Sequence, residues 1–413
     1  MANYLDILKE NNQEHLLKYL EMANENQKDE LIKEIEKINF DEIKELYKIS
    51  KRDNEKAIES KLIEHVKFVD KYKMSEENFN KYKKVGEDII KNGEYAVVTM
   101  AGGQGTRLGH NGPKGTFLLD VKPKPKYLFE MLADGIKRAN EKYGVILNWY
   151  IMTSTENDAK TEGFFKEHNY FDYPKDKIKF FKQGNLPLVS EEGKLLVDEN
   201  FHIKYAADGN GCIYKSMRLD GILDDMHKKG IKWIFIGAVD NALLNMVDPI
   251  LLGLTVSDGN QIGSKSVVKR SPEEPVGVFC KKDGKPGVIE YTELPTEMAH
   301  EVDEEGELLF GVSHIMYNLD SIDALDKISK EKLPYHSAHK KAPYMNEKGE
   351  LIKVTKPNAY KYEAFIFDGF AYFDNISILR GRRNEDFAPI KNAEGVDSPK
   401  TAIELYNNYW ENK

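Results

Sequence analysis

A glycine-rich stretch from Ala96 to Gly115, AVVTMAGGQGTRLGHNGPKG, combines the residue types that hold phosphate. It contains six glycines, Arg107, Lys114 and no acidic side chain. Glycines let backbone N–H groups approach an anion closely, and they adopt positive φ at no steric cost. Lysine supplies a compact charge, and arginine a planar fork that matches phosphate oxygens. The stretch therefore predicts a phosphate-binding loop whose charge comes from Arg107 and Lys114.

The loop matches neither of two standard nucleotide-binding motifs. A Walker A loop has a Lys–Ser/Thr pair after its second glycine, whereas Gly109 is followed by His110 and Asn111. A Rossmann fingerprint has a third glycine three residues after the second, whereas Leu108 stands at that distance from Gly105. Read by itself, the loop is equally compatible with a tight turn.

The elements around the loop predict an α/β fold. Short apolar runs predict strands, and amphipathic runs predict helices; the strands are expected at 95–101, 145–154, 177–184 and 232–240, and the helices at 127–143, 155–165 and 213–230. Thr155 with Asp158 resembles a capping box at the start of one helix. Strands that alternate with helices predict a parallel sheet covered on both faces. The loop then follows a strand end, where open α/β sheets bind ligands.

The first ninety residues have a different pattern. Apolar residues such as Leu16 and Leu20 recur at helical spacing among Lys and Glu, and Ser75 followed by two glutamates predicts the start of a helix that ends at Asn92 and Gly93. No cluster of catalytic groups occurs here. The region is expected to be a helical domain for packing or docking. After about residue 263, shorter strands rich in turns are expected.

The composition of the chain limits the kinds of partner and compartment that we expect for the protein. The net charge is −9, which disfavours general binding to nucleic acid or to anionic membranes. Two cysteines, Cys212 and Cys280, make no disulfide framework and favour a reducing compartment. No apolar run reaches the roughly 18–20 residues of a membrane span, and the N-terminus has no signal-peptide pattern. We therefore expect a cytoplasmic protein that binds neither membrane nor nucleic acid.

Several separated motifs resemble one known family in their order along the chain. They are MAGGQGTRLG, FFKQGNLPLVSEEGKLL, AADGNGCIYKSM, GAVDNAL, GVIEYTEL, LPYHSAHKKAPY, PNAYKYEAFIFD and DFAPIKNAEGVDSPKTA. The chain resembles the eukaryotic-type UDP-sugar pyrophosphorylases, in particular those that make UDP-N-acetylglucosamine. The resemblance implies a Rossmann-like, glycosyltransferase-A-like domain with a mixed, mainly parallel sheet. It also implies that UTP and a sugar 1-phosphate react, with Mg²⁺, to give UDP-sugar and pyrophosphate.

The resemblance also implies a domain division and roles for matched residues. It places a helical domain at 1–93, the nucleotidyltransferase domain at 94–385 and a short C-terminal segment at 386–413. The implied catalytic residues are Arg107, Lys114, Asp240 and Lys361. The implied nucleotide-binding residues are Met100, Ala101, Gly102, Gly103, Lys114, Gln183, Gly209, Asp240, Lys361 and Lys391. The implied sugar-binding residues are Asn210, Glu290 and His314, and the implied metal ligand is Asp240.

General chemistry agrees with two of these roles. A carboxylate that ends a strand, as Asp240 does, suits Mg²⁺, which keeps several waters and bridges substrate phosphates. The amide of Gln183 can match both the donor and the acceptor of a uracil edge. Without the resemblance, Asp240 with Asn241 would equally be a turn pair, and Gln183 a strand-end glutamine bonded to the backbone.

The sugar and the assembly stay open. Family members usually carry Asn where this chain has His314, in the stretch Gly311–His314, so sugar selectivity is in question. If His314 titrates beside the sugar, selectivity should vary between roughly pH 5.5 and 7.5. The alternatives are a UDP-glucose or broad-specificity UDP-sugar pyrophosphorylase, and a catalytically silent UDP-sugar-binding protein. Only about 22 residues follow Lys391, which leaves the oligomeric state and the support of that lysine undetermined.

Overall fold

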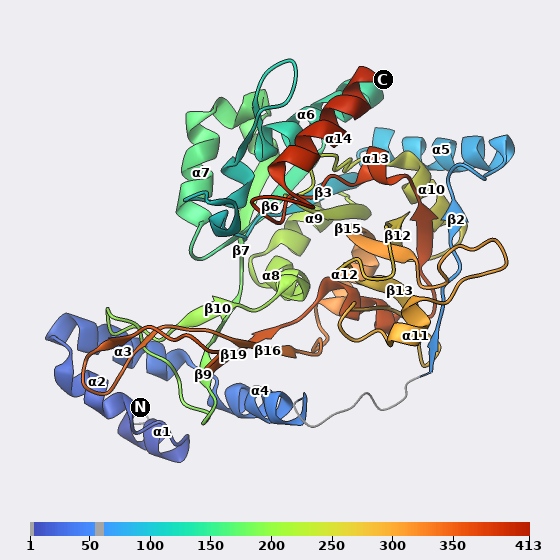
Figure 1. Ribbon diagram of the computed structural model, residues 1–413. Helices are drawn as coiled ribbons and strands as arrows, with labels where there is room; N and C mark the ends of the chain where they lie inside the picture. Colours follow the sequence, from blue (N-terminus) through green and yellow to red (C-terminus); the bar gives the residue numbers. More distant parts are fainter. Residues whose placement is uncertain (1–3, 54–61) are drawn as a thin grey trace. The chain divides into compact units, whose positions relative to one another are not determined.

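The computed structural model describes residues 4–53 and 62–413, which form two compact units (Figure 1). Unit 1 comprises 1–59, 184–212 and 333–365, and unit 2 comprises 60–183, 213–332 and 366–413. The borders differ from those expected at residues 93 and 385. The difference arises because two later segments pack with the first helices, a long-range association that local sequence patterns do not reveal.

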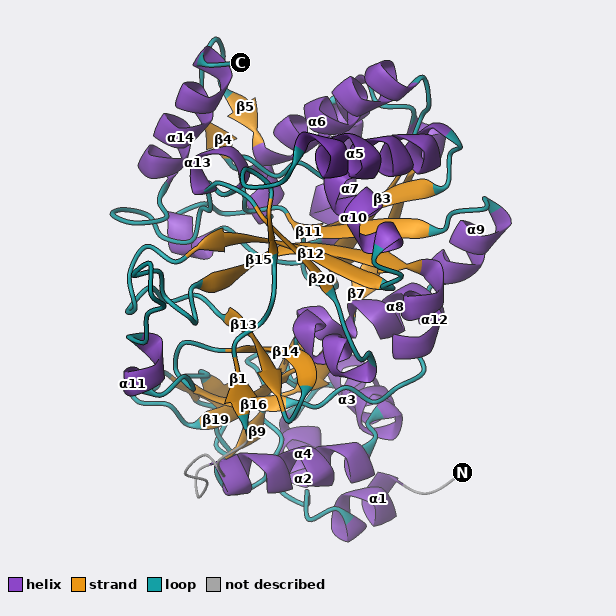
Figure 2. Ribbon diagram, turned by 90° about the vertical axis from the view of Figure 1, so that its right-hand side faces the viewer, coloured by secondary structure: helices purple, strands orange, loops and turns teal. Residues whose placement is uncertain are grey.

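An eleven-stranded mixed sheet forms the centre of unit 2 (Figure 2). Its strands are β1 (Ile63–Glu64), β2 (Val69–Asp70), β3 (Tyr95–Met100), β6 (Asn148–Ser154), β7 (Ile178–Gln183), β11 (Trp233–Ala238), β12 (Ile262–Val268), β13 (Val278–Lys282), β14 (Lys285–Ile289), β15 (Val312–Ser321) and β20 (Ser377–Arg380). The main order is β2-β20-β12-β15-β11-β3-β6-β7. Strands β11, β3, β6 and β7 are mutually parallel, and β15 runs antiparallel to both its neighbours β11 and β12. The predicted α/β fold with a mixed, mainly parallel sheet is confirmed.

Helices cover both faces of this sheet. The helices of unit 2 are α5 (Glu76–Lys91), α6 (Leu128–Tyr143), α7 (Asp158–Glu167), α8 (Ile213–Leu219), α9 (Ile222–Lys228), α10 (Pro249–Ser257), α11 (Thr296–Ala299), α12 (Ile322–Ile328), α13 (Arg383–Asp386) and α14 (Pro399–Glu411). In Figure 2, α5, α6 and α10 lie on one side of the strands, and α8 and α12 on the other. A short hairpin, β4 (Leu118–Leu119) and β5 (Lys126–Tyr127), precedes α6. Strand β3 is buried along its whole length, as its apolar sequence predicts.

Local signals placed most helix ends correctly. Ser75 caps α5 by accepting a hydrogen bond from the Asn78 N–H, and Gly144 ends α6 in the left-handed region. The helix expected at 213–230 is interrupted by Gly221, whose φ of 67° ends the helical path. The capping box expected from Thr155 and Asp158 is wrong, because Asp158 instead accepts a hydrogen bond from Thr153.

Unit 1 combines four helices with short strands from later in the chain. Its helices are α1 (Tyr4–Glu10), α2 (Leu16–Met22), α3 (Glu25–Lys37) and α4 (Phe40–Asp53). Its strands are β8 (Asn185–Pro187), β9 (Val189–Ser190), β10 (Tyr205–Ala207), β16 (His336–Lys340), β17 (Tyr344–Met345), β18 (Leu351–Ile352) and β19 (Ala359–Glu363). Leu31 and Ile35 of α3 share one core with Val189, Ile203 and Tyr360. The first helices therefore bury their apolar faces against residues that lie far away in the sequence.

In the part of the chain that the structure describes, no helix combines the length and the apolar character that crossing a membrane requires.

Strand β15 carries a buried acid, Asp320. Its side chain is fully buried, and neither carboxyl oxygen has a hydrogen-bond partner among the described residues. Burial raises the pKa of Asp320 from 3.8 to about 8. The folded protein therefore keeps the proton up to about pH 8, whereas the unfolded chain releases it near pH 4.

Replacing Asp320 with asparagine is expected to flatten the pH dependence of stability. Because the folded state binds the extra proton, the wild-type free energy of unfolding falls as pH rises between these two pKa values. The free energy of unfolding of the variant, relative to that of the wild type, should rise by about 1.4 kcal/mol per pH unit across that range. Denaturant unfolding of both proteins at pH 5, 6 and 7 measures this. Parallel curves would mean that Asp320 is ionised in the folded protein.

Candidate functional site

The predicted phosphate loop and Asp240 meet at one edge of the sheet. Strands β3 and β11 are parallel neighbours, with Met100 opposite Ala238, so the loops that follow both strands emerge together. The Nζ of Lys114 lies 2.8 Å from Oδ2 of Asp240, and both side chains are only partly exposed, at 17% and 26%. The structure thus unites two residues that are 126 positions apart in the sequence.

Backbone pairing within the loop gives Lys114 its direction. The Gly105 N–H donates to the Gly112 carbonyl (2.9 Å), and the Lys114 N–H donates to the Gly103 carbonyl (3.0 Å). Lys114 begins a short 3₁₀ turn, η2 (Lys114–Thr116), directly after this pairing. Arg107 lies on an earlier turn, η1 (Thr106–Leu108), and its side chain is exposed. Lys114, and not Arg107, is therefore the cation held against Asp240.

Asn157 anchors the start of the loop. Its fully buried side chain donates from Nδ2 to the carbonyls of Ala101 (3.0 Å) and Gly103 (3.4 Å). Its Oδ1 accepts from the Ser154 N–H (2.8 Å). Sequence reasoning missed Asn157, because Thr155 and Asp158 on either side of it were interpreted as a helix cap. An amide three residues after a buried strand, at the edge where the phosphate loop starts, was the signal available.

Gln183 lies against the glycines. It ends β7 and is 91% buried, and a Cβ built on Gly102 would stand 2.7 Å from its Oε1. The Ala101 N–H donates to the carbonyl of Met152 on the intervening strand β6. Residues 100–103 and Gln183 therefore share one edge of the sheet. The role expected for Gln183, recognition of the uracil base, stays a prediction.

Lys391 follows a segment that is bonded to Asp240. The Ile390 N–H donates to the backbone carbonyl of Asp240 (2.8 Å). The Lys391 N–H donates to the carbonyl of Asp397 (2.7 Å), whose carboxylate pairs with Arg270 at 2.8 Å. The support for the Lys391 loop, undetermined from the sequence, is thus a backbone contact on one side and an ion pair on the other.

Glu290 and His314 approach each other across Gly277. The His314 N–H donates to the Gly277 carbonyl (2.9 Å), and a Cβ built on Gly277 would lie 3.3 Å from Oε1 of Glu290. The His314 ring is buried, bonds Oδ1 of Asn318 through Nε2 (2.9 Å), and packs edge-on against Phe279. Burial lowers the pKa of His314 to about 4, so the ring is neutral throughout the range from pH 5.5 to 7.5. The expected titration in that range is not supported by this environment.

The remaining predicted residues belong to unit 1 and form a group there. The Gly211 N–H donates to the Ala364 carbonyl (2.8 Å), which brings the turn of Gly209 and Asn210 beside the end of β19. Gly209 has a φ of 96°, and an added Cβ would meet the Ala364 carbonyl oxygen at 2.2 Å. Lys361, on β19, pairs with Glu363 at 2.8 Å. The roles expected for Gly209, Asn210 and Lys361 stay predictions.

The residues around Lys114 suit a metal ion that binds together with the phosphates of the substrate. Within residues 4–53 and 62–413, no three His, Cys, Asp or Glu side chains gather into a metal-binding group. Mg²⁺ needs no protein cage, because it often binds one or two carboxylates together with substrate phosphates and water. Asp240, partly exposed beside a lysine at a strand end, offers one such carboxylate.

Comparison with known proteins identifies consistent relatives. The family model described as UTP–glucose-1-phosphate uridylyltransferase matches residues 19–402. The UDP-N-acetylglucosamine pyrophosphorylase of Saccharomyces cerevisiae is 37% identical over 339 residues, which are 79% of this chain and 71% of the yeast protein. UDP-N-acetylhexosamine pyrophosphorylase-like protein 1 of Homo sapiens is 39% identical over 318 residues; these are 74% of this chain and less than two thirds, 62%, of the human protein.

Solved structures agree on the fold. The uridine diphosphate N-acetylglucosamine pyrophosphorylase of Trypanosoma brucei, solved with an inhibitor, superimposes with a TM-score of 0.83 and 29% identity, covering 98% of this chain and 84% of the other. A UDP-glucose phosphorylase from the same organism gives a TM-score of 0.65 at 17% identity, covering 91% and 76%. At that identity the second similarity supports the fold alone.

Proposed function

Because the chain belongs to the UTP–glucose-1-phosphate uridylyltransferase family, we propose that it joins UTP to N-acetylglucosamine 1-phosphate, giving UDP-N-acetylglucosamine and pyrophosphate. The main observation in support of this proposal is the ion pair between Lys114, at the end of the glycine-rich loop, and Asp240. A cation, a carboxylate and backbone donors at one strand edge suit phosphoryl chemistry. The names of the yeast and T. brucei relatives support N-acetylglucosamine as the sugar.

The reaction requires positioning and charge stabilisation, without a protein nucleophile. A phosphate oxygen of the sugar 1-phosphate forms a bond to the α-phosphorus of UTP, while the bond from that phosphorus to the bridging oxygen breaks and pyrophosphate leaves. Lys114 neutralises charge on the phosphoryl oxygens, and Asn157 holds the loop in place. Asp240 would hold Mg²⁺, which supplies Lewis-acid stabilisation of phosphate charge when bound. Gln183 orients the base through its amide.

Pyrophosphate release tests the proposal. UTP is incubated with Mg²⁺ and, separately, with N-acetylglucosamine, glucose and galactose 1-phosphates; controls omit the sugar phosphate or add a chelator. We expect release only when both a sugar 1-phosphate and a divalent cation are present. Equal release from UTP alone would indicate a hydrolase. UDP-sugar binding without turnover of any sugar phosphate would indicate a silent binding protein.

Glucose 1-phosphate is the second candidate substrate. The family description names it, and this chain has His314 where the resemblance described above leads us to expect asparagine. A hydrogen bond to a sugar substituent can discriminate strongly, whereas an apolar wall typically contributes about 1–3 kcal/mol. The same panel decides between the sugars, because kcat/KM for each sugar 1-phosphate is measured under one set of conditions.

The preference between the two sugars is expected to be independent of pH from 5.5 to 7.5. His314 stays neutral there, because burial lowers its pKa to about 4. The ratio of kcat/KM for N-acetylglucosamine and glucose 1-phosphates should therefore change less than about twofold across the range. His314→Asn should shift the ratio at every pH while leaving KM for UTP nearly unchanged. A sigmoidal change centred near pH 6.5 in the wild type would show that the ring is titrating.

We also propose a cytoplasmic location. The support is chemical: Cys212 and Cys280 are both buried, and the two-cysteine composition suits a reducing compartment.

A further inference from the structure

The loop that carries Asp240 pairs with the segment that leads to Lys391. The Ala242 N–H donates to the Ala388 carbonyl (3.0 Å), and the Ile390 N–H donates to the Asp240 carbonyl (2.8 Å). Asn241 and Pro389 form an isolated antiparallel bridge between these bonds. Residues 240–242 and 388–390 thus run side by side although almost 150 residues separate them in sequence.

The Asn241 side chain fastens this pairing. It is 97% buried, and its Oδ1 accepts from the N–H groups of Ala388 (2.8 Å) and Leu243 (3.1 Å). Its Nδ2 donates to the Asp386 carbonyl (2.8 Å). One amide therefore bonds both strands of the pairing and uses its acceptor and its donor together, which neither an aspartate nor an alanine can do.

We propose that Asn241 is a positioning residue, which sets the register of segment 386–391, and hence the direction of Lys391, against Asp240. This inference rests on the proposed function, in which Asp240 would hold Mg²⁺, and on the nucleotide-binding role that the resemblance implies for Lys391. Asn241 acts through these neighbours. Its three hydrogen bonds go to backbone groups of Leu243, which follows Asp240, and of Asp386 and Ala388, which precede Lys391.

The Asp240 side of the pairing is fixed independently of Asn241. The Tyr317 hydroxyl donates to the Leu243 carbonyl (3.0 Å), and the Tyr95 hydroxyl donates to the Met246 carbonyl (2.7 Å). Loss of the Asn241 amide should therefore loosen residues 388–391, which follow the ion pair of Asp386, and leave the 240–248 loop in place. The expected displacement is of Lys391, not of Asp240.

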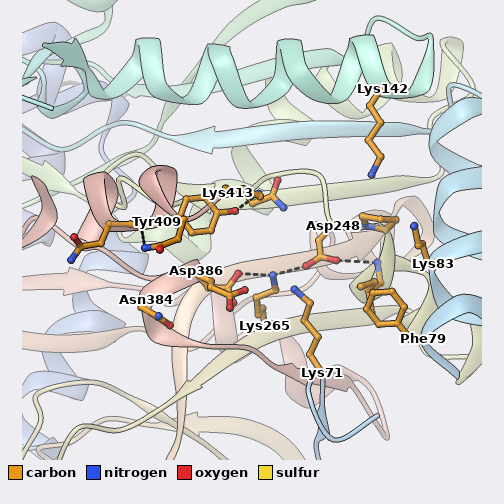
Figure 3. Close-up of a pocket in the computed structure, with 16 residues that line it drawn as sticks. Lys71, Phe79, Lys83, Lys142, Asp248, Lys265, Asn384, Asp386, Tyr409 and Lys413 are labelled. Carbon is orange, nitrogen blue, oxygen red and sulfur yellow. Dashed lines mark hydrogen bonds and ion pairs between the residues drawn. The ribbon is translucent and has the colours of Figure 1, made fainter. Parts of the chain in front are cut away.

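A buried ion pair network holds the far ends of the same two segments. Figure 3 shows Lys265 between Asp248 and Asp386, and its Nζ lies 2.5 Å and 2.7 Å from their carboxylates. Burial alone would raise the pKa of Asp248, but the Lys265 ammonium lowers it to about 2. Lys265 thus holds residues 248 and 386 together at a distance from Asp240. Asn241 determines how the two segments align beside Asp240.

Asn241→Ala tests this role. At a temperature well below the unfolding transition, kcat per folded enzyme is expected to fall about 10- to 100-fold, and KM for the sugar 1-phosphate to change little. The Ala388 and Ile390 amides should exchange hydrogen at least tenfold faster, while the Val97 and Val98 amides of β3 keep their wild-type rates. Asn241→Ser serves the same purpose if the alanine variant does not fold.

Asn140→Ala is the matched control. Asn140 accepts from the Leu147 N–H (3.1 Å) and donates to the Tyr173 hydroxyl (3.1 Å), so it is also a bridging asparagine of unit 2, but it touches no predicted site residue. It should lower stability and leave kcat per folded enzyme unchanged. Wild-type kcat and wild-type exchange at residues 388 and 390 in Asn241→Ala would overturn the inference. A wild type that turns over no sugar would instead refute the proposed function, and the exchange measurement would still test Asn241.

Discussion

Replacing Lys114 with alanine is expected to reduce kcat by about 10²–10³-fold while changing UTP affinity much less. The ammonium lies 2.8 Å from Asp240 at the end of the phosphate loop, where its charge matters most as electrons shift onto the phosphoryl oxygens. Loss of one such preorganised group typically costs about 3–4 kcal/mol of transition-state stabilisation. Steady-state kinetics with both substrates varied, together with direct measurement of UTP binding, separates the two effects.

Lys84→Ala is the control for this experiment. Lys84 also pairs with an aspartate, Asp88 at 3.5 Å, but it lies on α5 with 80% of its side chain exposed. Exposed pairs of this kind contribute well under about 1 kcal/mol, so its kinetics should match the wild type. A change smaller than threefold in both kcat and UTP affinity for Lys114→Ala would mean that the loop does not hold the reacting phosphates.

Two alanine substitutions in the same loop are expected to have opposite consequences. In Gly115→Ala the new Cβ would stand 2.2 Å from Cε2 of Phe129, a fully buried ring that packs on Phe165 at 4.9 Å between centroids. Overpacking of this kind should lower the free energy of unfolding by about 1–3 kcal/mol. In Gly103→Ala no atom lies within 4 Å of the new Cβ, so stability should stay within about 0.5 kcal/mol of the wild type.

UTP binding should distinguish the same two variants in the opposite way, with the larger loss in Gly103→Ala. Gly103 is exposed and lies where the nucleotide is proposed to bind, so its alanine variant is expected to raise KM for UTP about tenfold or more without loss of fold. Thermal unfolding and UTP titration of the two variants give the comparison. Normal UTP binding by Gly103→Ala would place the nucleotide elsewhere, and wild-type stability of Gly115→Ala would show that the Phe129 ring can move.

The sequence was most informative where local chemistry is decisive. The apolar run before the glycines became β3, Ser75 capped α5, and Gly144 ended α6 as their conformational preferences require. Lys114 was predicted in the loop after one strand and Asp240 at the end of another, and parallel neighbouring strands then brought them together. Periodicity and turn chemistry are properties of short segments, so they can be read without knowledge of the fold.

What the sequence did not reveal depends on distant partners. Asn157 and Asn241 are ordinary polar residues until the carbonyls and N–H groups they bond are known. The low pKa of His314 follows from a cage of aromatic rings on other elements, among them Phe279 and Phe370. Likewise, a helical N-terminal region was recognisable, but the strands that complete its core gave no signal that assigned them to it.

The composition of unit 1 from three separate segments has a consequence for biosynthesis. More than 270 residues separate its first segment, which ends at residue 59, from its last, which begins at residue 333. At about 5–20 residues per second, a ribosome needs roughly 15–60 seconds to deliver β16 and β19 after α4 has emerged. During that interval Leu31, Ile35 and their neighbours lack Met345, Tyr360 and Tyr362, which complete their core in the finished protein. The beginning of the nascent chain therefore exposes apolar surface of the kind that chaperones bind, and a fragment that ends at residue 93 would keep that surface exposed permanently.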